Sequence, residues 1–237
     1  MTDNIVIIHH QELDYRTNEA YKTLRTNIQF CGDDIKVISI TSCTPNEGKS
    51  SISFNLLASF VDIRKKVLLI DADLRKSVFK GRYKVENAEY GLTHYLSGQN
   101  KLDDIIYHTN IFNLDMIFCG SYTPNPVELL SHERFTNMIN KLREEYDYII
   151  VDTPPIGSVI DSAIVAKSVD GVIMVIESNT ISYRFAQYVK EQLEKTNCRI
   201  LGVVMNKVPM DKNKYNGKYY GKYYGKYYGT YGEKKQK

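Results

Sequence analysis

Short apolar runs that alternate with longer amphipathic stretches most constrain how this chain of 237 residues can fold. The runs are continuous and rich in Val and Ile, which is typical of strands that are buried on both faces. The predicted strands are Val37–Thr41, Val67–Ile70, Leu114–Phe118, Tyr148–Val151, Gly171–Ile176 and Leu201–Met205. Helices are expected near 49–61, 131–144, 159–168 and 182–195, and a further one in 12–30, outside the alternation. The pattern predicts an α/β fold with a parallel sheet, helices on both faces and ligands at the carboxyl ends of the strands.

Bulk composition fits a globular protein with one sizeable core, since 43% of the residues are hydrophobic and 25% are charged. The chain has no apolar run of 18 residues and no basic start followed by an apolar stretch. We therefore expect neither a membrane span nor a signal peptide. Its four cysteines are scattered without a CxxC pair, which predicts free thiols and a cytoplasmic location.

The last 27 residues differ from the rest of the chain. Residues 211–237 carry eight lysines and two acids, a charge of +6, which leaves −3 for residues 1–210 out of a total of +3. A Gly-Lys-Tyr-Tyr unit repeats with period four in 217–228, without Leu, Ile or Val to build a core. We predict a disordered tail, and because the basic charge lies there we expect no nucleic-acid-binding face on the body.

A phosphate-binding loop is predicted between the first strand of the alternation and the helix that follows it. The segment 41–51 reads TSCTPNEGKSS and ends in Gly48-Lys49-Ser50, the end of a P-loop. Glycine allows backbone N–H groups to approach phosphate oxygens, and the helix N-terminus adds partial positive charge. Lys49 would reach the β- and γ-phosphates, and the Ser50 hydroxyl would bind Mg²⁺.

Two further apolar runs end in aspartate. LLIDADLR (68–75) places Asp71 and Asp73 after one strand, and YIIVDTPP (148–155) places Asp152 after another, as in a Walker B strand. The carboxyl ends of parallel strands meet at one edge of a sheet, so these carboxylates would lie beside the phosphate loop. Together with Ser50, Asp73 and Asp152 are the predicted metal ligands.

The set TSxxPxEGKS, LLIDADLR and IIVDTPP, with its terminal tyrosine cluster, resembles the bacterial tyrosine kinases that accompany capsule and exopolysaccharide synthesis. The resemblance includes GLTHYLSG (91–98), CGSYTPNPVELLSHERF (119–135) and EAYKTLRTN (19–27). It implies a P-loop fold related to the septum-positioning and partition ATPases. Those carry a second lysine where this chain has Thr44, which favours the kinase branch.

Family resemblance also implies several site residues. ATP would contact the loop and the end of the last strand, at Pro45, Asn46, Glu47, Gly48, Lys49, Ser50, Ser51 and Asn206. The segment 19–27 is similar to the family's Glu-x-x-Arg-x-x-Arg assembly motif, with Glu19, Lys22 and Arg25 at its positions. Lys22 stands where the family has Arg, so the charge is kept but the bidentate fork is lost.

Tyrosine phosphorylation needs charge neutralisation and a group that accepts the phenol proton, because a phenol has a pKa of about 10. We assign Lys49 to the phosphates and Asp71 to the base, while Asp73 binds metal or orients its neighbours; Asp71 and Asp73 could exchange roles. Arg75 would contact phosphate or form a structural ion pair. The predicted phosphoacceptors are Tyr215, Tyr219, Tyr220, Tyr223, Tyr224, Tyr227, Tyr228 and Tyr231.

Three functions fit these residues: an autophosphorylating tyrosine kinase, a partition-type ATPase that controls assembly without phosphorylating protein, and a nucleotide-binding regulator of polysaccharide assembly. The kinase hypothesis accounts for the tail best, although interleaved Lys and Tyr also suit stacking on RNA or sugars. The resemblance implies a membrane-embedded activator on a separate chain and a place at the inner face of the membrane. It also implies self-association, for which a ring is one candidate form. The predicted domains are an N-terminal oligomerisation segment (1–35), a kinase domain (36–210) and the tail (211–237).

Overall fold

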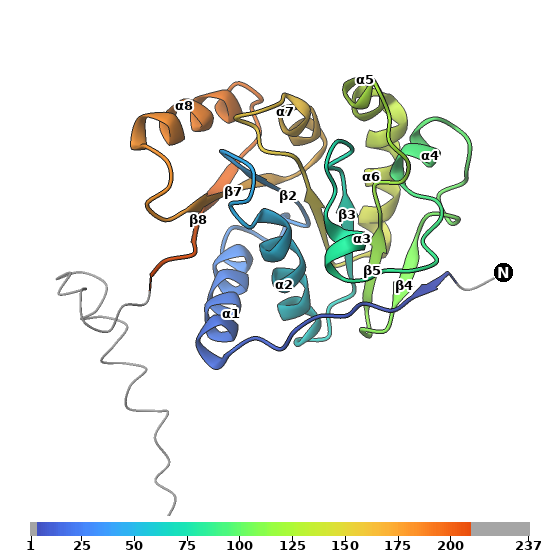
Figure 1. The fold of residues 1–237 in the computed structure, drawn as a ribbon, viewed down its shortest axis with the longest axis horizontal. Coiled ribbons are helices and arrows are strands. Elements are labelled where there is room, and N and C mark those ends of the chain that lie inside the picture. The colour runs from blue at the N-terminus through green and yellow to red at the C-terminus, as the bar shows by residue number, and fades with distance from the viewer. Residues whose placement is uncertain (1–3, 210–237) are drawn as a thin grey trace, which may run out of the picture. The chain divides into compact units, whose positions relative to one another are not determined.

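A central sheet dominates the computed structural model, which describes residues 4–209 (Figure 1). Within these residues the sheet has eight strands in the order β1-β4-β5-β3-β6-β2-β7-β8. The strands are β1 Ile5–Val6, β2 Val37–Ser42, β3 Val67–Asp71, β4 Tyr107–Thr109, β5 Leu114–Ile117, β6 Tyr148–Asp152, β7 Gly171–Glu177 and β8 Ile200–Asn206. The strand pairs are parallel except β4–β5, which is antiparallel. The predicted parallel sheet is confirmed as a mostly parallel one.

The six predicted strands are present, with ends that agree to within one residue. Strands β1 and β4 were not predicted, because two- and three-residue segments at the edge of a sheet carry too few side chains to show a pattern. The four cysteines are free thiols, as expected.

Nine helical segments connect the strands within the described residues. They are α1 Tyr15–Gln29, α2 Lys49–Val61, α3 Phe79–Arg82, α4 Leu92–Leu96, α5 Pro126–Ser131, α6 Glu133–Glu145, α7 Asp161–Val165, a 3₁₀ turn at Ala166–Ser168 and α8 Tyr183–Glu194. The helix expected near 159–168 is α7 with the 3₁₀ turn. Helices α3, α4 and α5 were not predicted, because four to six residues do not complete two turns of apolar periodicity.

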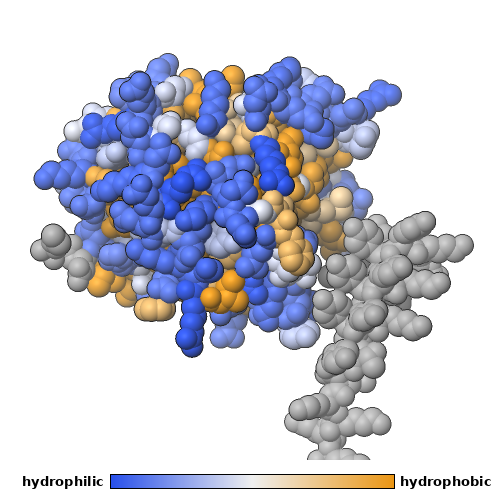
Figure 2. All heavy atoms as spheres, turned by 180° about the vertical axis from the view of Figure 1, so that it is seen from behind, coloured by the Kyte–Doolittle hydropathy of each residue, from blue (hydrophilic) through white to orange (hydrophobic). Residues whose placement is uncertain are grey.

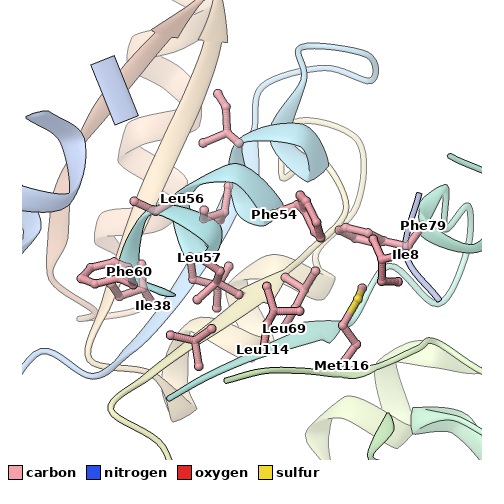
Figure 3. Packing of buried hydrophobic residues seen from close by; sticks show 14 of the residues in the cluster. Ile8, Ile38, Phe54, Leu56, Leu57, Phe60, Leu69, Phe79, Leu114 and Met116 are labelled. Atoms are coloured by element: carbon pink, nitrogen blue, oxygen red, sulfur yellow. The ribbon is translucent and has the colours of Figure 1, made fainter. Parts of the chain in front are cut away.

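One face of the sheet is covered by α1 and α2. Phe54 and Leu57 of α2 pack with Leu69 of β3 and Met116 of β5, and Phe54 and Leu57 are completely buried (Figure 3). Helix α1 adds Ile28 to this cluster and begins at Asp14, whose carboxylate accepts hydrogen bonds from the two N–H groups of Arg16 and Thr17. An aspartate at this position satisfies backbone donors that no helical carbonyl can reach.

The opposite face is covered by α4–α7, with α8 beside β7. Leu68 and Ile70 of β3 point to this side, in alternation with Leu69, and pack with Phe135 and Leu142 of α6. On the face that Figure 2 shows, hydrophilic side chains predominate and hydrophobic ones appear between them. Among the described helices, none combines the length and the apolar character that crossing a bilayer requires. Both faces of the sheet are thus covered, and its carboxyl edge positions the site.

The chain divides after Asn206 into two units, the first of which ends with β8. The predicted tail, with its eight candidate phosphoacceptor tyrosines, lies outside the described residues. The division into an N-terminal segment, a kinase domain and a tail stays a prediction.

Candidate active site

The loop between β2 and α2 has the backbone geometry of an anion site. Gly48 precedes Lys49 with φ +92°, a left-handed conformation that favours glycine, and helix α2 begins there without a side-chain cap. The first N–H groups of α2 therefore face outward without a capping oxygen, which suits a phosphate. A Cβ at Gly48 would lie 2.2 Å from Asn206 Nδ2, so any other residue would have to displace that amide.

Glu47 shapes this loop from inside. Its side chain is buried and accepts hydrogen bonds from the backbone N–H groups of Thr44, at 2.8 Å, and of Glu177, at 3.3 Å. The carboxylate therefore braces the loop against the end of β7. Both carboxylate oxygens of Glu47 are thus engaged within the protein, and its contact with a nucleotide stays a prediction.

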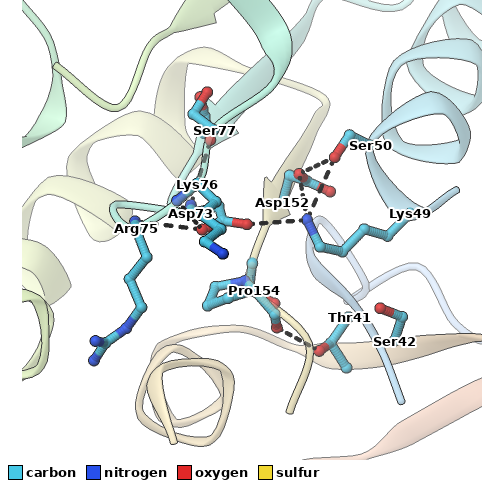
Figure 4. Close-up of polar contacts among 12 residues, drawn as sticks. Thr41, Ser42, Lys49, Ser50, Asp73, Arg75, Lys76, Ser77, Asp152 and Pro154 are labelled. Atoms are coloured by element: carbon cyan, nitrogen blue, oxygen red, sulfur yellow. Dashed lines mark hydrogen bonds and ion pairs between the residues drawn. The ribbon is translucent and has the colours of Figure 1, made fainter. Parts of the chain in front are cut away.

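The Lys49 ammonium lies between two carboxylates, Asp73 of the loop after β3 and Asp152 at the end of β6 (Figure 4). Its Nζ is 3.3 Å from Asp73 Oδ2 and 3.4 Å from Asp152 Oδ2. Burial works to lower the pKa of Lys49, but Asp152 and Asp73 outweigh it and raise the pKa. The ammonium therefore stays charged, at the start of α2, where phosphate would bind.

Asp152 ends β6 and is held by two serines of α2. Ser50 Oγ donates to Asp152 Oδ2 at 2.7 Å, and Ser53 Oγ lies 2.8 Å from Asp152 Oδ1 and 2.9 Å from the Lys49 carbonyl. Asp152 is 1% exposed, and this burial raises its pKa despite Lys49 and both serines. The hydroxyl and carboxylate oxygens of Ser50 and Asp152 thus form a compact pair of the oxygen type that Mg²⁺ prefers, and their role as metal ligands stays a prediction.

Asp71 ends β3 directly opposite Asp152 in the pairing of β3 with β6. Its carboxylate is fully buried, accepts a hydrogen bond from the Ser77 hydroxyl and lies 3.3 Å from the Asp73 N–H. Burial raises the pKa of Asp71 to about 7, and the hydrogen bond from Ser77 works against that rise. A carboxyl group with such a pKa is suited to exchanging a proton near neutral pH.

Asp73 is folded back on its own loop. Its Oδ1 accepts hydrogen bonds from the N–H groups of Arg75 and Lys76, at 3.3 and 2.9 Å, which leaves Oδ2 facing Lys49. The Arg75 guanidinium reaches across to Asp161 and donates from Nε at 2.9 Å and from Nη2 at 3.0 Å. Of the two roles considered for Arg75, the structure shows the ion pair.

Comparison with known proteins agrees with this geometry. A family model described as "AAA domain" matches residues 35–201. The tyrosine-protein kinase CpsD of Streptococcus pneumoniae serotype 4 is 46% identical over 200 residues, which cover 84% of this chain and 88% of that protein. The chain belongs to the bacterial tyrosine kinase family.

Solved structures show the same fold. The kinase domain of the Escherichia coli tyrosine kinase ETK superposes with a TM-score of 0.76 at 32% identity, over 82% of this chain and 78% of that one. The complete etk protein is 34% identical over 192 residues, which cover 80% of this chain and 26% of etk. The septum site-determining protein MinD of Pyrococcus horikoshii, complexed with Mg-ADP, has a TM-score of 0.65 at 25% identity, over 75% of this chain and 72% of MinD. The bacterial tyrosine kinase described here thus has the P-loop fold. Its sequence relatives are named tyrosine kinases, so the hypothesis of a partition-type ATPase is not favoured.

Two further sets of predicted residues of the kinase lie at the end of β8 and on α1. Asn206, at the end of β8, donates from Nδ2 to the Glu47 carbonyl at 2.8 Å, so it touches the phosphate loop; its contact with adenine stays a prediction. On α1, Lys22 pairs with Glu19 at 2.8 Å, while Arg25 donates to the Ser59 carbonyl of α2 in the same chain. The assembly role of these three α1 residues stays a prediction.

Three residues that support the site of the kinase were not predicted: Ser53, Ser77 and Asp161. Ser53 follows Lys49 by four positions, so it lies on the same face of α2, and a serine in that apolar helix was a usable signal. Ser77 and Asp161 gave no such signal, because each is a common surface residue whose partner is set by the tertiary fold.

Proposed function

We propose that this kinase uses ATP and Mg²⁺ to phosphorylate tyrosines of its own C-terminal segment. The observation that carries the proposal is the Lys49 ammonium, 3.3 Å from Asp73 and 3.4 Å from Asp152 at the start of α2. This arrangement sets a cation and metal-binding oxygens at one helix N-terminus, as phosphoryl transfer requires. The segment with eight of the 19 tyrosines supplies acceptors within the same chain.

The residues present fit Mg²⁺ together with a nucleotide. Ser50 Oγ and Asp152 Oδ2 are 2.7 Å apart, and Asp73 Oδ2 lies across Lys49 from them. Among the described residues, no three His, Cys, Asp or Glu side chains form a metal cluster by themselves. That suits Mg²⁺, which usually keeps water and phosphate oxygens and takes only one or two carboxylates. When bound, ATP supplies the phosphoryl group and Mg²⁺ offsets its charge.

The side chains of the site have different roles in the proposed phosphotransfer. Lys49 balances phosphate charge, and backbone N–H groups of the loop from Asn46 to Ser51 orient the phosphates. Asp71 accepts the phenol proton, because burial brings the pKa of its carboxyl to about 7. Asp73 turns Oδ2 toward Lys49 and keeps Oδ1 on its own loop, which favours the metal or orienting role.

Phosphorylation would invert the charge of the acceptor segment. Each phosphate adds about −1.5 to −2, so eight of them would add roughly −12 to −16 to a segment of charge +6 beside a body of charge −3. We infer that the unmodified segment docks on acidic surface of neighbouring copies and that the modified one is repelled. The kinase would thereby regulate capsule or exopolysaccharide synthesis, held at the inner face of the membrane by a membrane-embedded activating chain.

Intact-mass measurement tests the proposal most directly. Full-length protein incubated with ATP and Mg²⁺ should gain mass in steps of one phosphate that map to residues 215–231. Lys49→Met should abolish the gain, whereas Lys65→Met, which removes a lysine paired with Asp147, should preserve it. Phosphate release without a mass gain would support the ATPase hypothesis instead. An unchanged oligomer size after full phosphorylation would contradict the charge switch.

A further inference from the structure

Asp161 is the first residue of α7, and its carboxylate is buried. It is not among the residues assigned to bind the nucleotide, bind the metal or accept the phosphate. It is 0% exposed, and a buried charge without a partner is costly. Its partner is Arg75, whose planar guanidinium meets both carboxylate oxygens, at 2.9 and 3.0 Å. Such a bidentate pair fixes direction as well as distance.

The two sides of this pair differ in how firmly they are anchored. Ser162, next to Asp161, donates to the Pro154 carbonyl in the turn after β6, and Thr41 of β2 donates to the same carbonyl at 2.9 Å. The start of α7 is therefore fastened to the sheet. Arg75 is on the loop after β3 and its side chain is 38% exposed, so it is the partner that has to be held.

Arg75 in turn holds the loop after β3, residues 71–77, which carries Asp71 and Asp73. Its backbone N–H donates to Asp73 Oδ1, and the neighbouring N–H of Lys76 donates to the same oxygen. That leaves Asp73 Oδ2 pointing at Lys49. A displaced Arg75 would therefore move the Asp73 carboxylate and the segment that leads to Ser77, the partner of Asp71.

We propose that Asp161 is a positioning residue, which clamps Arg75 and thereby fixes the loop that presents Asp71 and Asp73. The proposal rests on the phosphotransfer assigned to this site. Release of the clamp would affect turnover, because misplacement of a reacting group by about 1 Å lowers rates by about 10²-fold. The affinity for ATP would change less, since Glu47 and Asn206 hold the phosphate loop and Lys49 keeps its contact with Asp152.

Asp161→Asn tests the clamp, because it keeps the shape and removes the charge. We expect kcat for autophosphorylation to fall by about 10- to 100-fold, with the KM for ATP within about twofold of wild type. Arg75→Lys should have the same effect, because an ammonium cannot bind both oxygens in the plane of the carboxylate. The double variant should be no worse than either single one, as is expected of two residues that act as a unit. Arg75→Lys also decides the question if Asp161→Asn fails to fold.

The pair of Arg143 and Asp170 provides a matched control. Arg143 Nη1 lies 2.6 and 2.7 Å from the Asp170 oxygens, and Asp170 also accepts the N–H groups of Lys36 and Val37 at the amino end of β2. This pair is at the edge of the sheet opposite to the site. Arg143→Lys should therefore leave kcat within about twofold of wild type, and an equal loss of kcat in this control would overturn the proposal.

Amide hydrogen exchange measures how firmly residues 71–77 are held, independently of enzymatic turnover. In nucleotide-free protein, amides of residues 71–77 should exchange faster in Asp161→Asn than in wild type, and at the wild-type rate in Arg143→Lys. Unchanged exchange of 71–77 in Asp161→Asn would overturn the proposal. A wild-type protein that does not phosphorylate its own tail contradicts only the proposed acceptor, and the exchange result still decides whether Asp161 holds the loop.

Discussion

Asn206 at the end of β8 donates a hydrogen bond to the carbonyl of Glu47 at 2.8 Å, across 159 residues of sequence. The same amide nitrogen occupies the space into which a Cβ on Gly48 would project. The conformation of the phosphate loop is therefore fixed from two sides, by the buried Glu47 carboxylate within it and by Asn206 outside it. A substitution at Gly48 should therefore disturb the contacts that both Glu47 and Asn206 make with the loop.

Gly48→Ala should weaken nucleotide binding far more than folding. The new methyl group meets Asn206 Nδ2 at 2.2 Å, and a φ of +92° is strained for any residue with a Cβ. The loop would relieve both by moving away from the phosphate position, so we expect at least about tenfold weaker ADP binding in calorimetry, for a stability loss of about 1–3 kcal/mol. Gly81→Ala is the control, because a Cβ there meets no atom within 4 Å. Equal ADP affinity in the two variants would contradict the prediction.

Ser50 and Ser53 both bond Asp152, but we expect their loss to differ in kind. Ser50→Ala removes a proposed metal ligand, so the rate should fall by about 10² or more, with little change in melting temperature. Ser53→Ala removes the hydroxyl that donates to Oδ1 of Asp152 and leaves that buried carboxylate oxygen without its donor. It should cost about 1–3 kcal/mol of stability, with a smaller loss of rate. Thermal melts and single-turnover rates of both variants distinguish the two, and a reversed order would show that the roles are exchanged.

The sequence predicted the strands that matter to the site because each is an apolar run that ends in a polar residue. The expected burial on both faces was wrong for β8, which lies at the edge of the sheet and exposes Val203 and Met205. A parallel sheet gathers those ends at one edge, so the proximity of Lys49, Asp73 and Asp152 followed from the fold class. The antiparallel strand β4 was missed, because its three residues, Tyr107–Thr109, show no alternation of their own.

Pairings between polar residues that are distant in the sequence could not be predicted from it. Arg75 and Asp161 are 86 residues apart, and nothing in either segment indicates that one faces the other. Their meeting depends on how α7 packs beside the loop after β3. The N-terminal helix illustrates the converse, because its start coincides with a local signal, the aspartate at position 14, whereas its packing on α2 has no such signal.

Tyr146→Phe should lower stability without an effect on catalysis. The Tyr146 hydroxyl is buried and donates to Asp115 Oδ2 at 2.7 Å, while Asp115 Oδ1 lies 2.8 Å from His108 Nδ1. Burial and the neighbouring carboxylate raise the pKa of Tyr146, so the phenol stays protonated and remains a donor. Removal of the hydroxyl leaves a largely buried carboxylate oxygen without that donor, at a cost of about 1–3 kcal/mol in urea unfolding. A change in kcat beyond about twofold would contradict the structural role.

Asp71→Asn should stabilise the nucleotide-free protein at alkaline pH while it abolishes phosphotransfer. Burial raises the pKa of Asp71 from an ordinary value of 3.8 to about 7. Because the folded state binds the proton more tightly than the unfolded state, the stability that Asp71 contributes is fully present below about pH 4 and is lost as the pH rises through about 7. An asparagine never acquires the buried charge. The melting temperature of the variant should exceed that of wild type most at pH 8, and the difference should shrink toward pH 5.

Asp147→Asn is the control of opposite sign for this measurement. Burial alone would raise the pKa of Asp147, but hydrogen bonds from the Lys66 N–H and the Lys65 ammonium lower it below 3.8. Its contribution to stability is therefore present above about pH 4 and is lost as the pH falls through the folded pKa. Asp147→Asn should melt below wild type at both pH 5 and pH 8, whereas Asp71→Asn should melt above wild type at pH 8. If Asp71→Asn melts below wild type at pH 8, its carboxylate is stabilised by its neighbours and cannot be the group that titrates near neutral pH.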